Sequence, residues 1–215
     1  MPHNQHPSDE FSPRTVVSSQ TVYDGLIWDV LHDEVDLAPG GPRITRDYVS
    51  HPGAVAVVVL DEQDRVLLIN QYRHPVGMTL WELPAGLLDV EGEAPLRAAQ
   101  RELWEEADRT AAQWAVLTDV FLSPGSSSEA MRIFLARQAS EVATAERFER
   151  TDEEAEMRSD WVPLDEALQA VLGGRIHNPS AVVGILAAHA ARAQGYRHLR
   201  PADAPFTAHP GLRDS

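Results

Sequence analysis

The stretch AVAVVVLDEQDRVLLINQYR, residues 54–73, constrains the fold more than any other part of the chain. Two runs rich in β-branched residues flank the polar turn DEQD, which is the pattern of a β-hairpin. Residues 55–60 are apolar without interruption, as in a strand that is covered on both faces of its sheet. The sequence therefore predicts a central strand that lies between two helical layers.

Further strands and helices are predicted on both sides of this hairpin. Before it, turn signals divide the chain into three segments with the character of strands, residues 15–25, 26–37 and 43–51. After it, we expect strands near 80–83, 114–122, 131–139 and 160–164, and helices at 94–107, 165–172 and 179–193. The expected fold class is α/β (α+β), with a mixed sheet between helical layers.

The acidic composition limits the classes of partner and site. The formal net charge is −15, and nucleic acids and anionic membranes favour basic patches, so we expect neither as a partner. The 215 residues have no cysteine, which excludes disulfides, a thiolate zinc site and a cysteine nucleophile. There is no signal-peptide pattern and no apolar run near 18 residues, so we expect a soluble, cytoplasmic protein.

Three glutamates share one face of the helix predicted over residues 94–107. Glu102, Glu105 and Glu106 stand at positions i, i+3 and i+4, where like charges repel by roughly 0.2–0.5 kcal/mol per pair. An acidic cluster near a helix C-terminus also opposes the helix dipole. One interpretation is a solvated charged face, in which Arg101 pairs with Glu105.

A second interpretation is a site for divalent cations. The three acids adjoin the apolar stripe of the helix, and the turn PAG, residues 84–86, follows a strand shortly before it. Carboxylates that converge with an exposed backbone carbonyl are the hard oxygen ligands of Mg²⁺ or Mn²⁺. Bound cations would remove the repulsion, screen an anionic substrate, and could activate a water for attack on a phosphoryl group.

The same stretch resembles the Nudix box, whose pattern is Gly, five residues, Glu, seven residues, then Arg-Glu-aliphatic-x-Glu-Glu-x-Gly-aliphatic. The positions that match are Gly86, Glu93, Arg101, Glu102, Leu103, Glu105 and Glu106. Six residues, 87–92, stand where the pattern has five, so the loop must bulge. Asp108 replaces the glycine that would cap the helix in the αL conformation, which Asp adopts at some cost.

Outside the box, residues 15–195 resemble the ADP-ribose pyrophosphatase branch of this family. The supporting segments are TRDYVSHPGAVAVV, QYRHP, WELPAGLLD and the proline of SPGSSSE. Pro124 stands 15 residues beyond Arg109, the spacing associated with ADP-ribose specificity. The resemblance implies a Nudix-type α/β/α sandwich plus a small N-terminal antiparallel sheet. It also implies hydrolysis of ADP-ribose to AMP and ribose 5-phosphate with Mg²⁺ or Mn²⁺.

The resemblance implies a set of metal ligands within the box. Ala85 would give its carbonyl oxygen, and Glu102 and Glu106 their carboxylates, with Glu105 as an additional ligand. Glu105 and Glu106 therefore count as catalytic residues as well.

The general base of this branch comes from an acidic loop after the box, here TDEEAEM, residues 151–157. We favour Glu154, with Glu156 and Glu153 as the next candidates. A solvated acidic loop is the alternative. Within the box, the resemblance assigns Glu93 and Arg101 to bracing the loop against the helix.

For the substrate, the guanidinium of Arg73 in QYRHP is expected to reach the diphosphate, because its planar fork matches phosphate oxygens. Arg46 and Glu82 are candidates for the two ends of the substrate. The alternative for Arg46 is an arginine on the surface of a strand.

The expected organisation has four parts. Residues 1–14 form a disordered tail, 15–52 an N-terminal β region, 53–195 the Nudix hydrolase domain, and 196–215 a C-terminal tail. The resemblance implies that the N-terminal sheet is exchanged between two subunits of a homodimer. Trp28 in this region could stack on adenine, pack in a core or contact the second subunit.

Two other functions stay open on the sequence. One is hydrolysis of another nucleoside diphosphate sugar or a dinucleotide. The other is a non-catalytic sensor that binds ADP-ribose and regulates a partner. We expect a sensor to lose some of the metal-binding acids, and here all of them are present.

Overall fold

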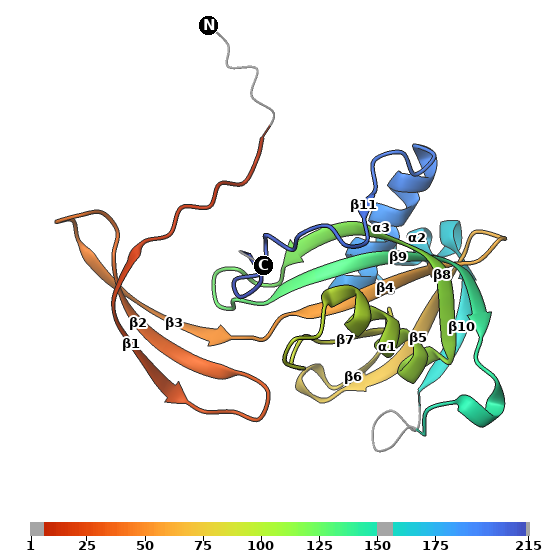
Figure 1. Ribbon diagram of the computed structural model, residues 1–215, viewed down its shortest axis with the longest axis horizontal. Helices are drawn as coiled ribbons and strands as arrows, with labels where there is room; N and C mark the ends of the chain where they lie inside the picture. The colour runs from red at the N-terminus through yellow and green to blue at the C-terminus, as the bar shows by residue number, and fades with distance from the viewer. Residues whose placement is uncertain (1–6, 150–156, 214–215) are drawn as a thin grey trace, which may run out of the picture. The chain divides into compact units, whose positions relative to one another are not determined.

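The computed structural model describes residues 7–149 and 157–213, and the chain divides into two compact units at Ser50/His51. The first unit holds an antiparallel sheet of three strands in the order β1-β2-β3 (Figure 1). These strands are β1 (Thr15–Tyr23), β2 (Asp29–Asp36) and β3 (Arg43–Ser50). All three predicted strands are therefore confirmed.

The second unit has a mixed sheet with helices on its two faces (Figure 1). Its strands are β4 (Ala54–Leu60), β5 (Arg65–Arg73), β6 (Met78–Glu82), β7 (Ala85–Leu87), β8 (Arg109–Phe121), β9 (Ala130–Glu141), β10 (Arg158–Pro163) and β11 (Arg200–Pro201). The order is β10-β5-β4-β9-β8-β11, with β6 paired to β5 and β7 to β4. β4 and β9 run parallel. The helices are α1 (Pro95–Ala107), α2 (Leu164–Leu172) and α3 (Pro179–Ala193).

The core lies on both faces of β4, as the uninterrupted apolar run predicted. Every residue of β4 is buried. Val57 belongs to a cluster with Leu103 of α1, whereas Val58 belongs to a cluster with Ile185 of α3. Side chains alternate between the two faces of a strand, so β4 joins the two helical layers. The predicted α/β/α sandwich is confirmed.

The helix of the box ends as its sequence predicted. Asp108 adopts φ 50° and ψ 42°, the αL conformation that the family pattern gives to glycine. Its N–H donates to the carbonyl of Trp104 at 3.1 Å, which closes the last turn. The αL conformation costs an L-residue roughly 1–2 kcal/mol, so the rest of α1 must hold this end in place.

The turn predicted at residues 84–86 is partly a strand. Ala85–Leu87 form β7, which pairs antiparallel with β4. The N–H of Val57 donates to the carbonyl of Pro84 at 2.8 Å. The box loop therefore starts on the sheet itself. Three residues carry too little alternation for a pattern of period two to reveal such a strand.

The end of the chain differs from the tail predicted over residues 196–215. Residues 200–213 pack against the rest of the second unit. Phe206 and His209 are buried there, and β11 pairs with β8. The buried guanidinium of Arg132 donates to two carbonyl oxygens of this segment. The polar, proline-containing composition suggested a tail, but it also suits an extended segment held by a few buried anchors.

The N-terminal tail predicted over residues 1–14 is described only from residue 7, and residues 7–14 are exposed and form neither helix nor strand. None of the described helices is long and apolar enough to cross a membrane.

Candidate active site

Two of the three glutamates of α1 are buried against strand β7. Glu102 is 9% exposed and Glu106 is 7% exposed. The Glu106 carboxylate accepts the N–H of Ala85 at 2.8 Å. A Cβ atom at Gly86 would lie 2.0 Å from the Glu102 carboxyl group. Glycine at this position therefore lets the carboxylate approach the strand, which explains why the box begins with Gly.

Arg101 joins the box loop to the helix, as predicted. Its guanidinium donates two hydrogen bonds to Glu93, at 3.1 and 2.9 Å. It also donates to Glu102 at 2.5 Å and to Glu105 at 3.0 Å. The hydrogen bond with Glu93 raises the pKa of Arg101, burial opposes this effect, and Glu102 and Glu105 add to it. The Arg101–Glu105 pair of the first interpretation exists, but as one part of this larger network.

Acidic side chains dominate this cluster. The carboxylates of Glu93, Glu102 and Glu105 pair with the guanidinium of Arg101, and the carboxylate of Glu106 accepts the N–H of Ala85. The carboxylates of these glutamates offer hard oxygen atoms as metal ligands, which suit Mg²⁺ or Mn²⁺. Across residues 7–149 and 157–213, no group of three His, Asp or Glu side chains is placed to hold a metal ion by itself. The chemistry of the donors fits a divalent cation, and the individual ligand assignments remain predictions.

Arg73 and Glu82 meet on the strands next to the box. Arg73, the last residue of β5, donates to both oxygens of the buried Glu82 carboxylate on β6, at 3.0 and 2.8 Å. The register places Glu82 opposite Ile69. Leu67, two residues before Ile69 on β5, packs in the cluster around α1. Because alternate residues share a face, this ion pair lies on the α1 face of the sheet.

Gln71 is a residue that the sequence reasoning missed. It stands two positions before Arg73, on the same face of β5, and is 8% exposed. Its Oε1 atom is buried and has no hydrogen-bond partner among the described residues. A buried amide oxygen without a donor is costly, so this atom is a candidate contact for a ligand. The only sequence signal was a polar side chain just after the apolar run VLLI, residues 66–69 of β5.

The remaining predicted site residues lie in the first unit or outside the described residues. Arg46 is exposed on β3 of the first unit, where it donates to the carbonyl of Thr45 at 2.7 Å. Its role in substrate binding remains a prediction. Glu153, Glu154 and Glu156, the candidates for the general base, lie outside the described residues.

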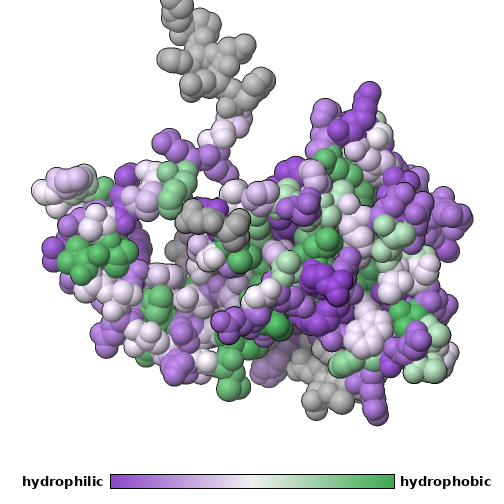
Figure 2. Space-filling view, viewed as in Figure 1, coloured by the Kyte–Doolittle hydropathy of each residue, from purple (hydrophilic) through white to green (hydrophobic). Residues whose placement is uncertain are grey.

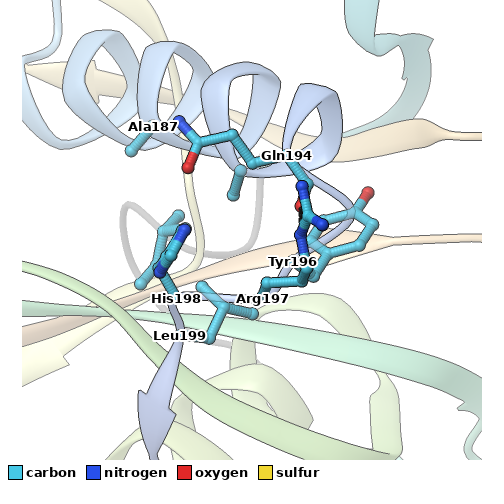
Figure 3. Close-up of a pocket in the computed structure, with 8 residues that line it drawn as sticks. Ala187, Gln194, Tyr196, Arg197, His198 and Leu199 are labelled. Atoms are coloured by element: carbon cyan, nitrogen blue, oxygen red, sulfur yellow. Dashed lines mark hydrogen bonds between the residues drawn. The ribbon is translucent and has the colours of Figure 1, made fainter.

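A cavity of about 150 Å³ lies away from the box, against α3 (Figure 3). Gln194 at the end of this helix lines it, together with Arg197 and His198 of the segment that leads to β11. None of its lining residues belongs to the box. The acids of α1 together with the backbone of β7, and not this cavity, define the candidate active site.

The family described as the NUDIX domain matches residues 50–180, more than half of the chain. The chain belongs to the Nudix family. The match includes the box of α1 and β7 and also the pair of Arg73 and Glu82. The resemblance inferred from the box is therefore confirmed. Nudix hydrolases in general need a divalent metal ion, which agrees with the oxygen-rich donor set.

Curated relatives extend beyond the Nudix domain. An ADP-ribose pyrophosphatase of Mycobacterium tuberculosis is 44% identical over 194 residues, 90% of this chain and 91% of that protein. An ADP-ribose pyrophosphatase of Bacillus subtilis is 31% identical and covers 79% of this chain and 89% of its own length. A methanol dehydrogenase activator of Bacillus methanolicus is 32% identical, and the match covers 81% of this chain and 91% of that protein.

A solved structure supports the Nudix fold. The crystal structure of an ADP compounds hydrolase matches with a TM-score of 0.69 and 21% identity. The match covers 87% of this chain and 99% of the chain of the solved structure. At this identity the likeness concerns the fold alone.

Proposed function

We propose that this Nudix hydrolase cleaves the diphosphate of ADP-ribose in the presence of Mg²⁺ or Mn²⁺. Water attacks one phosphorus atom of the bridge, and the products are AMP and ribose 5-phosphate. The observation that carries the proposal is the 44% identity, over 90% of the chain, to an enzyme named ADP-ribose pyrophosphatase. The complete set of charged box residues on α1 and its preceding loop supports catalysis over a sensor role.

The chain provides hard oxygen ligands for the metal. Ala85, Glu102 and Glu106 lie close together through the contacts of both carboxylates with β7. We propose these residues as ligands, with Glu105 as an additional one. A bound divalent cation would polarise the phosphoryl oxygens, lower the pKa of a water molecule and offset the negative charge of the substrate.

The chain also provides the cationic group for the diphosphate. The Arg73 guanidinium is partly exposed, whereas its partner Glu82 is buried. The ion pair holds the fork of Arg73 in one orientation, which reduces the entropy lost when a phosphate binds. We propose that Arg73 binds the diphosphate, that Arg46 and Glu82 contact the ends of the substrate, and that Gln71 accepts one hydrogen bond from it.

A substrate panel tests the reaction and its dependence on metal. We expect the purified chain to hydrolyse ADP-ribose in Mg²⁺ or Mn²⁺, and to lose activity in excess EDTA, because the acids alone repel the substrate. Phosphate release coupled to a phosphatase measures the rate on each compound. Other nucleoside diphosphate sugars and dinucleotides serve as competing substrates. A clear preference for one of them would contradict the ADP-ribose assignment, while preserving the reaction class.

Arg73→Ala tests how the substrate is bound. A charge-assisted hydrogen bond contributes roughly 1.5–3 kcal/mol, so we expect kcat/KM to fall on the order of ten- to a hundred-fold. Arg73→Lys should restore only part of the loss, because a point charge does not reproduce the guanidinium fork. Arg65→Ala is the matched control, since Arg65 pairs with Asp61 at the other end of β5. An unchanged kcat/KM in Arg73→Ala would assign Arg73 to a structural role with Glu82.

We also propose a homodimer formed through the first unit. All of β1 is exposed, and apolar side chains show on the surface of this unit (Figure 2). The exposed apolar residues around the β1–β2 turn are Val22, Tyr23, Leu26, Ile27 and Trp28. A sheet of three short strands is marginal in water by itself, and such a patch of exposed apolar side chains indicates an interaction surface. Sedimentation should give twice the mass of one chain, and a monomer would contradict the proposal.

A further inference from the structure

The imidazole of His209, in the C-terminal segment, connects this segment with the start of β4. Its Nε2 lies 2.6 Å from the carbonyl oxygen of Pro52, which can only accept, so Nε2 carries the proton. Its Nδ1 accepts the N–H of Gly211 at 3.1 Å, so Nδ1 is unprotonated. The two contacts together fix one neutral tautomer and one orientation of the ring.

Gly53, which follows Pro52 in the sequence, lies close against the imidazole ring of His209. Its φ is +89°, and a Cβ atom here would lie 2.3 Å from Nε2 of His209. The carbonyl oxygen of Gly53 accepts the N–H of Leu88 at 3.0 Å. Leu88 is two residues after Gly86, within the box loop. A short chain of contacts therefore runs from the C-terminal segment to the loop of the active site.

The same junction also contacts the loop between β8 and β9. The N–H of His51 donates to Oγ of Ser128 at 3.0 Å. The imidazole of His51 accepts the N–H of Gly53 at 3.0 Å. Residues 51–53 are therefore bonded to the β8–β9 loop through Ser128 and to the C-terminal segment through His209.

The C-terminal segment is itself firmly anchored. Arg132, almost fully buried on β9, makes two hydrogen bonds to Asp119, at 2.8 and 3.0 Å. The same guanidinium donates to the carbonyls of Ala204 and Pro205 and lies 4.3 Å from the ring centre of Phe206. A buried cation that loses these partners would be left with unpaired donors, so the segment is held in place at residues 204–206, shortly before His209.

We propose that His209 is a positioning residue of the active site. Through Pro52 and Gly53, it holds the backbone to which Leu88 of the box loop is bonded, and so fixes the loop that precedes the metal-binding acids. The box loop follows Ala85 and Gly86 directly, so a shift of Gly53 is transmitted to the strand that contacts Glu102 and Glu106. The catalytic part of this inference rests on the proposed function.

Hydrogen exchange of the full-length chain tests the coupling without any assay of activity. We expect His209→Ala to speed amide exchange in peptides that span residues 86–93 by about tenfold, as the loss of one buried hydrogen bond implies. His209→Gln should keep the slow exchange, because its side-chain amide can still donate to the Pro52 carbonyl. His198→Ala is the control, since this exposed histidine lines the cavity against α3. Unchanged exchange at 86–93 in His209→Ala would overturn the proposal.

Kinetics add a readout that a merely structural role would not change. We expect His209→Ala to raise the Mn²⁺ concentration for half-maximal rate and to lower kcat several-fold, with KM for ADP-ribose little altered. His209→Gln should restore both values. Equal defects in the Ala and Gln variants would overturn the role of the hydrogen bond. If the wild-type chain does not hydrolyse ADP-ribose, the proposed function fails, and the exchange at 86–93 still decides the positional coupling.

Discussion

Glu106→Gln is expected to abolish turnover while the protein remains folded. The variant keeps the size and shape of the side chain, and its amide oxygen can still accept the N–H of Ala85. What it loses is the negative charge that a divalent ion needs in its ligand. A metal ion contributes several kcal/mol of transition-state stabilisation, so the rate should fall on the order of 10³-fold or more.

Two comparisons make this result specific. Circular dichroism and a thermal melt should show that Glu106→Gln has nearly the stability of the wild type, because the hydrogen bond to β7 survives. Glu105→Gln should reduce the rate less, since Glu105 is more exposed than Glu106 and is bonded to Arg101. A near-wild-type rate of Glu106→Gln at saturating Mg²⁺ would refute the assignment of Glu106 as a ligand.

Much of the second unit could be predicted because its signals are local. The apolar run of β4 specifies a strand that is buried on both faces, and the structure has it so. The spacing of the box acids placed Glu102 and Glu106 beside the apolar stripe, and both are buried. The helix ends at Ala107 as its pattern predicted, and Asp108 takes the αL conformation that the family pattern gives to glycine. Each of these features depends on neighbours within a few residues.

The features that were missed depend on distant partners. His209 and Pro52 are 157 residues apart in the sequence, and nothing in the composition of residues 196–215 indicates their hydrogen bond. Arg132 stands in an apolar strand, where its pairing with Asp119 and with two carbonyls could not be read from its neighbours. A buried charge is tolerated only when such partners exist, so Arg132 was a signal that an anchor must be nearby.

The pair of Arg73 and Glu82 shows a different limit. The sequence marked both residues as substrate contacts, but it did not show that they bind each other. Their contact follows from the register of β5 and β6, which places Glu82 opposite Ile69 and on the face of Arg73. Local patterns identify the chemistry of side chains, whereas the pairing of strands decides which of them meet.

β10 begins beside the strand end that carries the proposed diphosphate-binding arginine. Its first residue, Arg158, pairs with Asn70, three residues before Arg73 on β5. Glu153, Glu154 and Glu156 precede β10 in the sequence and lie outside the described residues. The choice of Glu154 as the general base therefore stays a prediction.

Glu154→Gln is accordingly expected to lower kcat by roughly 10²- to 10⁴-fold, the range for loss of a general base. Affinity for metal and substrate should change little, because the acids of α1 and Arg73 are retained. If Glu154 is a metal ligand instead, rising Mn²⁺ should restore much of the lost rate. Steady-state kinetics of Glu153→Gln and Glu156→Gln under the same conditions rank the three acids. If all three variants keep the wild-type kcat, the base lies outside this loop, and Glu105 and Glu129 are the next residues to test.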